Sequence, residues 1–141
     1  DYPDEAILAT LKGNVEKNLD EDAAQVLKVQ GHAWGTPLGE EKKFDVIMLA
    51  DCLWLEDQQR GLLKSIRDNL ANDGVAYLTF MEHNDHVREF FPLAKEFSLD
   101  YEELASMPWG GRELEDFDLE DEEADGLVYF GKMNKVQGHQ P

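Results

Sequence analysis

Hydrophobic residues recur at two different spacings along this chain, and the change of spacing marks its expected elements. Over 4–18, 56–70 and about 84–97, apolar positions return every three or four residues, which predicts three amphipathic helices. The residues expected to face inward on the second and third helices are Leu62, Leu63, Ile66, Leu70, Val87, Phe90, Phe91, Ala94 and Phe97. Each of these helices therefore has an apolar face that can pack against another layer.

Short apolar runs between the helices predict strands. They lie at 26–29, 44–50, 75–81 and 127–133, and the segment 98–104 alternates weakly. The run at 44–50 is nearly continuously apolar, as in a parallel strand covered on both faces, so we expect it at the centre of the sheet. The alternation of helices with strands predicts a single α/β domain, Rossmann-like and doubly wound, with a mostly parallel sheet.

Acidic residues are unevenly distributed along the chain. The formal net charge is −18, and residues 100–125 contain twelve carboxylates against one base, Arg112. This charge argues against binding to a nucleic-acid backbone, which needs clustered Lys and Arg. Because 105–125 combines two adjacent glycines with dense like charge, we expect an insertion there that can be disordered. It is either a solvated loop or a surface that steers a basic protein.

Cysteine and histidine usage bears on the compartment and on metal binding. Cys52 is the single cysteine, so the chain has no disulfide framework and no paired-cysteine motif. No basic leader precedes an apolar stretch, and no apolar run approaches the roughly 18 residues of a membrane helix. We therefore expect a soluble, cytoplasmic protein.

His83 and His86 lie at a strand-to-helix turn without a second cluster, so no metal site is expected.

Candidate ligand-binding residues are those that follow the expected strands. In doubly wound sheets a ligand binds in the crevice at the carboxyl ends of the strands. These positions are 32–35, 50–54 and 82–84, together with 1–4 if a strand precedes them. No phosphate-binding loop and no hydrolase or kinase motif is present in the chain. These four segments therefore carry the candidate chemistry.

Three motifs in these segments are similar to those of a known enzyme family. They are Asp1-Tyr2-Pro3-Asp4 opening a helix that contains Asn14-Val15-Glu16-Lys17-Asn18, then Trp34-Gly35, and then Ala50-Asp51-Cys52-Leu53-Trp54. Together they resemble the seven-stranded S-adenosylmethionine-dependent methyltransferases. The narrower resemblance is to the fungal nicotinamide N-methyltransferase-like group, which is related to the methyltransferases of translation elongation factor 1-alpha and to the methyltransferase-like 21 family. It covers roughly the first 100 residues and fades in the acidic segment.

The resemblance implies three residues that bind S-adenosyl-L-methionine. Asp1 would accept hydrogen bonds from both ribose hydroxyls, since a carboxylate is an acceptor only; as a residue alone it can equally cap the following helix. Trp34 would lie against the adenine, with Gly35 permitting close backbone approach, and the alternative for Trp34 is a structural, partly buried aromatic. Ala50 would touch the cofactor at the end of a strand, where its small side chain leaves space.

The same resemblance places Asp51 and Trp54 at the methyl-acceptor site. The family motif reads Asp-x-x-Tyr, and this chain departs from it at Trp54, whose indole can donate only through its ring N–H. Asp51 would orient and desolvate an incoming amine for in-line transfer; otherwise it is an exposed residue that caps the following helix. The departure at Trp54 bears on which acceptor is used.

The resemblance implies an N-methyltransferase that acts on a protein lysine or amino-terminal amine, with elongation factor 1-alpha as a candidate substrate. The alternatives are a methyltransferase of a nicotinamide-like small amine and a non-catalytic module that binds a basic partner. In the family fold a first strand with a Gly-x-Gly loop comes earlier, so 1–141 is expected to form one partial domain lacking its first strands. Strand 44–50 would then have an unpaired apolar edge, and the chain alone is expected to bind S-adenosylmethionine poorly.

Overall fold

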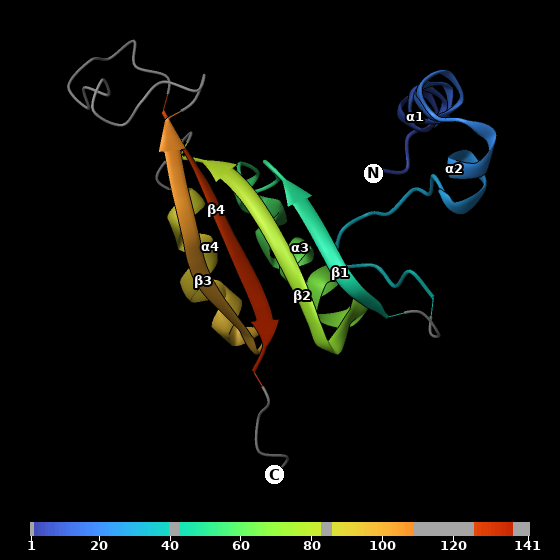
Figure 1. The fold of residues 1–141 in the computed structure, drawn as a ribbon. Helices are drawn as coiled ribbons and strands as arrows, with labels where there is room; N and C mark the ends of the chain where they lie inside the picture. The colour runs from blue at the N-terminus through green and yellow to red at the C-terminus, as the bar shows by residue number, and fades with distance from the viewer. Residues whose placement is uncertain (1, 40–42, 83–85, 109–125, 137–141) are drawn as a thin grey trace.

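The computed structural model describes residues 2–39, 43–82, 86–108 and 126–136, which form helices and one sheet (Figure 1). The helices are α1 (Glu5–Asn18), α2 (Glu21–Val26), the short 3₁₀ helix η1 (Glu56–Gln58), α3 (Gln59–Asn69) and α4 (His86–Glu96). The strands are β1 (Phe44–Ala50), β2 (Leu70–Met81), β3 (Leu99–Pro108) and β4 (Leu127–Lys135). The three main helices predicted at 4–18, 56–70 and 84–97 are confirmed to within a few residues at each end.

The four strands form one mixed sheet in the order β1-β2-β4-β3. β1 pairs with β2 in parallel, and β4 is antiparallel to both of its neighbours, β2 and β3. Three strands therefore run in one direction, with the last strand of the sequence inserted in reverse between two of them. The α/β prediction is confirmed, with an antiparallel strand that hydrophobic patterning did not indicate.

The core lies between the sheet and helices α3 and α4, which both lie behind the sheet in Figure 1. The expected inward positions are buried there: Leu62, Leu63, Ile66, Leu70, Val87, Phe90 and Ala94. Phe91 and Phe97 are half-buried and pack against this cluster. On the opposite face of the sheet, Figure 1 shows no described helix, while α1 and α2 lie to the side of β1.

The position of β1 corrects one prediction and confirms another. β1 was expected at the centre of the sheet, but in the described part of the chain it is an edge strand that pairs only with β2. Its side chains on the uncovered face are exposed, Val46 to 52% and Met48 to 83%. The continuous apolar run is thus present without the covering layers that usually explain it. The expected apolar, unpaired edge at 44–50 is confirmed for the described residues.

The strand predicted at 26–29 is wrong. Asp20 accepts a hydrogen bond from the Ala23 N–H at 2.9 Å, and the acidic first turn of α2 favours the helix dipole. Helix α2 therefore extends to Val26, which is 88% exposed, and 27–34 continues without regular structure. Three apolar residues interrupted by Lys28 are too short a run to distinguish a strand from a helix end.

β1 has its predicted bounds, whereas β2, β3 and β4 are longer than predicted. β2 begins at Leu70, opposite Phe44, and the pairing then jumps to Val75 opposite Val46. The residues between them form the register shift between β1 and β2. β3 continues to Pro108 and so takes the first residues of the acidic stretch expected at 105–125; the remainder, up to Asp125, lies outside the described residues.

Candidate functional site

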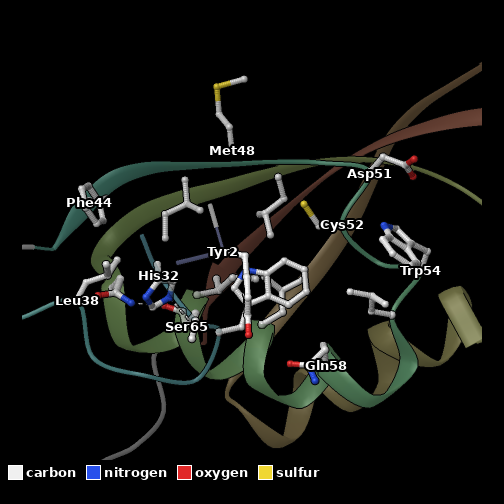
Figure 2. Close-up of a pocket in the computed structure, with 18 residues that line it drawn as sticks. Tyr2, His32, Leu38, Phe44, Met48, Asp51, Cys52, Trp54, Gln58 and Ser65 are labelled. Atoms are coloured by element: carbon white, nitrogen blue, oxygen red, sulfur yellow. Dashed lines mark hydrogen bonds between the residues drawn. The ribbon is translucent and has the colours of Figure 1, made fainter. Parts of the chain in front are cut away.

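A cavity of about 940 Å³ lies alongside β1, between this strand, α3 and the segment 32–38 (Figure 2). Its lining includes Tyr2, His32, Trp34, Asp51, Cys52, Trp54, Gln58 and Ser65. Figure 2 shows His32 and Ser65 toward one end of the cavity and Asp51 and Trp54 toward the other. The Met48 side chain points away from it, to the other face of β1. The cavity thus brings together segments that lie on both sides of β1 in the sequence.

The segment 32–35 is held against α3 by one serine hydroxyl. The Gly35 N–H donates to Ser65 Oγ at 2.7 Å, and His32 Nε2 lies 2.9 Å from the same oxygen. Ser65 is buried, so these bonds form away from bulk water. A neutral His32 can accept the Ser65 hydroxyl proton, which gives a chain from the Gly35 N–H through Ser65 Oγ to His32 Nε2. This chain fixes the backbone on each side of Trp34.

Two glycines allow this close packing. Gly35 has φ +85°, a left-handed conformation that glycine adopts without steric cost. A Cβ on Gly61 of α3 would lie 3.2 Å from the Trp34 carbonyl oxygen and 3.4 Å from Trp34 Cβ. The Trp34 backbone therefore rests directly on the helix at Gly61. The close approach of this loop to α3 explains why positions 35 and 61 are both glycine.

Burial lowers the pKa of His32 below its ordinary value of 6.5. The cause is desolvation, because the charged imidazolium loses water when it is enclosed beside Ser65. The neutral ring is the form that accepts the Ser65 hydroxyl proton in the chain described above. The lowered pKa and the hydrogen-bond geometry therefore favour the same protonation state.

The end of β1 carries the most unusual backbone of the site. Asp51 has φ +49°, in a left-handed region that non-glycine residues seldom occupy, although Asp tolerates it better than most. Its N–H donates to the Thr79 carbonyl of β2 at 2.8 Å, so the last pairing of the sheet secures this turn. Such conformations concentrate at functional sites, because surrounding structure must stabilise them. The turn directs the exposed Asp51 and Trp54 to the end of the cavity in Figure 2.

Cys52 and Gln59 complete this turn. The Cys52 Sγ lies 3.3 Å from the Ala50 carbonyl, and burial raises the pKa of this thiol. Gln59, the first residue of α3, is 4% exposed, and its Nε2 donates to the carbonyls of Leu53 at 3.2 Å and His86 at 2.9 Å. Because Leu53 is itself 1% exposed, the middle of the loop is anchored in the core while Asp51 and Trp54 stay outside. The loop after β1 is thus held at both ends and in its centre.

The structure brings three of the five predicted site residues to one cavity. Trp34, Asp51 and Trp54 all line it. Ala50 lies at the end of β1, opposite Thr79, and is not among the lining residues. Asp1 lies outside the described residues. The roles assigned to these residues remain predictions.

Sequence reasoning missed Ser65 and Gln59. Ser65 and Gln59 do carry a signal, because each is a polar residue on the buried side of α3, and buried polar groups need partners. Which partner each would find could not be known, since the segments that they contact are separated from them by between 6 and 33 positions. Tyr2, which belongs to the candidate segment 1–4, also lines the cavity.

The histidines discounted as metal ligands are placed in part. His86 pairs with Glu56 at 3.3 Å and with Glu89 at 3.4 Å, while His83 lies outside the described residues. Within the described ranges, no group of three His, Cys, Asp or Glu side chains is arranged to hold a metal ion. Nor is any described helix long and apolar enough to cross a membrane.

Comparison with known sequences finds one family. A sequence model described as lysine methyltransferase matches residues 1–97. Among curated proteins, the "protein N-terminal and lysine N-methyltransferase EFM7" of Candida glabrata is 32% identical over 120 residues, covering 77% of this chain and 47% of that protein. The protein of the same name from Candida albicans is 28% identical over 150 residues, covering 92% of this chain and 57% of that protein. The chain therefore spans about half the length of these relatives.

Solved structures similar to this fold are methyltransferases. The glycopeptide N-methyltransferase MtfA, complexed with S-adenosyl-L-methionine, has a TM-score of 0.64 at 11% identity and covers 96% of this chain and 70% of its own. The precorrin-6y C5,15-methyltransferase of Geobacter metallireducens has a TM-score of 0.57 at 12% identity, with 94% and 63% covered. At such identities the likeness concerns the fold alone.

Proposed function

Because this chain belongs to the lysine methyltransferase family, whose sequence model matches residues 1–97, we propose that the protein transfers a methyl group from S-adenosyl-L-methionine to an amine. The observation that carries this proposal is the cavity beside β1. It is lined both by a tryptophan on a glycine-supported loop and by an exposed carboxylate on a left-handed turn. The first suits a flat aromatic ligand, and the second suits a cation.

The described residues fit the adenosine part of the cofactor. Trp34 is half-buried, lines the cavity and is held from behind by α3, so its ring can serve as a fixed stacking surface. Ala50 and Asp1 are proposed to contact the cofactor as well, on the strength of the family motif. When bound, S-adenosylmethionine supplies an activated methyl group on a sulfonium; the protein contributes binding, orientation and exclusion of water.

The proposed task of Asp51 is to orient the accepting amine. Its carboxylate is exposed at the end of the cavity, where it can accept hydrogen bonds from an incoming ammonium or amine group. Trp54 lies beside it, 52% exposed, and offers an indole face to the same cation. Alignment of the amine with the methyl group is where the protein accelerates such a reaction.

The proposed acceptor is a protein, either a lysine side chain or an amino terminus. Two observations support this choice: the curated relatives carry those acceptors in their names, and a net charge of −18 favours a basic partner. We propose a translation elongation factor as the first substrate to test, and the cytoplasm as the compartment, where a free Cys52 is stable. A nicotinamide-like amine and a non-catalytic binding role are the alternatives that the assay must separate.

The test is a methyl-transfer assay with radiolabelled S-adenosylmethionine on the protein at its full natural length. Cell extract and nicotinamide are offered together, and Asp51→Asn is compared with wild type. Asparagine tolerates the left-handed backbone at this position, so the variant removes the charge without straining the turn. We expect label in a protein band that falls at least about tenfold in the variant.

The remaining outcomes decide against the proposal. Label in nicotinamide alone would replace the protein acceptor with a small amine. No label in any acceptor, with no binding of S-adenosylhomocysteine by calorimetry, would leave a binding module. Equal labelling by wild type and Asp51→Asn would remove Asp51 from the acceptor site. Asp45→Asn, an exposed change within β1, is the matched control and should leave labelling unchanged.

A further inference from the structure

Helix α3 contacts both loops of the cavity through buried polar side chains. Gln59, Ser65 and Asn69 are the buried polar residues of the described chain, and all three lie on this one helix. Gln59 binds the loop after β1 and Ser65 binds the segment 32–35. Asn69 donates to the Ser65 carbonyl at 2.8 Å and so stays within the helix. Gln59 and Ser65 therefore contact the two loops that carry the candidate site, whereas Asn69 does not.

These contacts satisfy buried polar groups that an apolar core would not contain. Burying a polar group carries a penalty unless it is hydrogen-bonded, and an apolar side chain at the same position avoids that penalty. Yet each of the two groups is satisfied by a loop backbone and not by the helix itself: both Gln59 donor bonds and the Ser65–Gly35 bond reach outside α3. What these bonds determine is the position of the loops.

The spacing of the two residues relates the loops to one another. Gln59 and Ser65 are six positions apart, or about 9 Å along a helix axis. Gln59, at the start of this rigid element, holds Leu53, between Asp51 and Trp54, while Ser65, farther along it, holds Gly35, next to Trp34. The helix itself is fixed in the core by Leu62, Leu63 and Ile66. A single rigid element thus fixes the two loops relative to one another.

We infer that Gln59 and Ser65 are positioning residues, Ser65 for the cofactor loop around Trp34 and Gln59 for the acceptor loop that carries Asp51 and Trp54. This inference rests on the proposed function and assigns a separate part of it to each residue. Ser65 governs the affinity for the cofactor, whereas Gln59 governs the alignment of the acceptor. Neither side chain is a catalytic residue, because each acts through the backbone of another segment.

Gln59 also ties the acceptor loop to a second element. Its amide donates to the His86 carbonyl at the start of α4 as well as to Leu53, and both protons of one amide nitrogen are used. His86 in turn pairs with Glu56 of η1, directly before α3. A methionine at position 59 has similar length and no donor, so it would remove this donor from the Leu53 and His86 carbonyls. The loop would then lose its central anchor while the helix stays packed.

The test separates binding from transfer in three variants of the full-length protein. Ser65→Ala should weaken S-adenosylhomocysteine binding about tenfold by calorimetry, with kcat at saturating cofactor changed less than about twofold. Gln59→Met should leave that Kd within about twofold while kcat/KM for the acceptor falls about tenfold. Leu99→Val, a core change on β3 at the other edge of the sheet, is the control for lost stability and should alter neither quantity.

Conservative variants supply the second measurement. Ser65→Thr keeps the hydroxyl and should restore binding. Gln59→Glu removes both donors at neutral pH, but burial raises the pKa of such a carboxyl, and its protonated form can donate one bond. Acceptor turnover by Gln59→Glu should therefore recover in part as the pH falls, in contrast to Gln59→Met. If Ser65→Ala does not fold, Gly61→Ala displaces the same loop without removing a buried polar group.

Two results overturn the inference, and they are distinguishable from a failure of the proposed function. If Ser65→Ala and Gln59→Met lower binding and turnover together, in proportion to their loss of melting temperature, both residues are merely structural. If neither variant changes either quantity, the loops are positioned by other contacts. A wild-type protein that neither binds S-adenosylhomocysteine nor labels any acceptor refutes the proposed function itself, and the inference with it.

Discussion

Gly61 shows how a missing side chain can shape a binding site at the scale of one residue. A Cβ there would press on the Trp34 backbone, whereas glycine within a helix is destabilising by about 1 kcal/mol relative to alanine. We expect Gly61→Ala to leave the free energy of unfolding nearly unchanged, because the two effects oppose each other, and to weaken cofactor binding several-fold. Urea denaturation and calorimetry with S-adenosylhomocysteine measure the two quantities.

Gly13 provides the matched control for this prediction. It lies in the exposed helix α1, and a Cβ there would meet nothing within 4 Å. Gly13→Ala should therefore stabilise the protein by up to about 1 kcal/mol and leave cofactor binding unchanged. Equal effects of the two substitutions on binding would show that the contact between Gly61 and Trp34 has no bearing on the site.

His32 makes the segment 32–35 sensitive to pH. Its pKa is lower in the folded protein than the ordinary value of 6.5, so the unfolded chain binds the proton more readily. The contribution of His32 to stability is therefore complete above pH 6.5 and is lost as the pH falls from there through the folded pKa. Cofactor affinity should decline over the same range, because protonation breaks the acceptor role of Nε2 toward the Ser65 hydroxyl.

The variant that isolates this effect is His32→Gln, which keeps a hydrogen-bonding group but does not titrate. Melting temperature and cofactor Kd are measured for both proteins between about pH 5 and 7.5, where few carboxylates titrate. We expect the difference between wild type and variant to change below about pH 6.5. Parallel pH profiles for the two proteins would contradict the role given to His32.

At the scale of elements, the pairing of β3 with β4 includes a tyrosine ring that packs directly over a glycine. Tyr101 of β3 lies over Gly131 of β4, and a Cβ on Gly131 would overlap that ring. The ring cannot move easily, because it stacks on Phe91 of α4 with centroids 4.0 Å apart, and burial raises the pKa of Tyr101 to about 12. Gly131→Ala should therefore destabilise the protein by about 2 kcal/mol.

A double-mutant cycle tests this account of the sheet. In Tyr101→Ala the space above position 131 is open, so adding Gly131→Ala to it should have little further effect on the free energy of unfolding. Urea denaturation of the four proteins measures the coupling. If Gly131→Ala destabilises equally with and without the tyrosine ring, the glycine is required for its backbone and not for the ring.

Elements with a regular period were the predictable part of this fold. The helices at 4–18, 56–70 and 84–97 and the buried stripe of α3 follow from apolar spacing, which is a local property. The order of the strands does not, because pairing depends on residues far apart in the sequence. β1 has the composition of a central strand and lies at the edge, and β4 reverses direction between two parallel strands.

The candidate site was predictable to a similar degree. Motifs after strands pointed to Trp34, Asp51 and Trp54, and the fold brings them to one cavity. The groups that hold them, Ser65 and Gln59, could not be assigned from sequence because a buried polar side chain reveals its need for a partner and not the partner's identity. Resemblance to a family located three residues that line the cavity, whereas the supporting contacts required the structure.

At the scale of the whole molecule, the uncovered face of β1 is the main liability. Val46 and Met48 are exposed on a strand that, among the described residues, has a neighbour on one side only. A polypeptide of these 141 residues should therefore associate as its concentration rises, in spite of its net charge of −18. Sedimentation velocity at increasing concentrations would detect this association.

Substitution of both side chains tests the cause. Val46→Lys together with Met48→Lys should reduce the association of the 141-residue polypeptide, whereas Val26→Lys, on the exposed surface of α2, should not. Association that persists unchanged in the double variant would place the contact elsewhere. Each added lysine reduces the net negative charge of −18, so weaker association of the double variant would not come from stronger repulsion between copies.

The insertion of β4 between β2 and β3 also has a consequence for how the protein is made. A ribosome that has released the chain as far as Pro108 has completed β3, yet the strand that will join β3 to the sheet has not been synthesised. Until Leu127–Lys135 emerges, β3 has α4 as its packing partner and two open edges. The residues translated between β3 and β4 are densely acidic. Nascent chains on the same messenger RNA therefore repel one another while β3 is still unpaired, which disfavours their association.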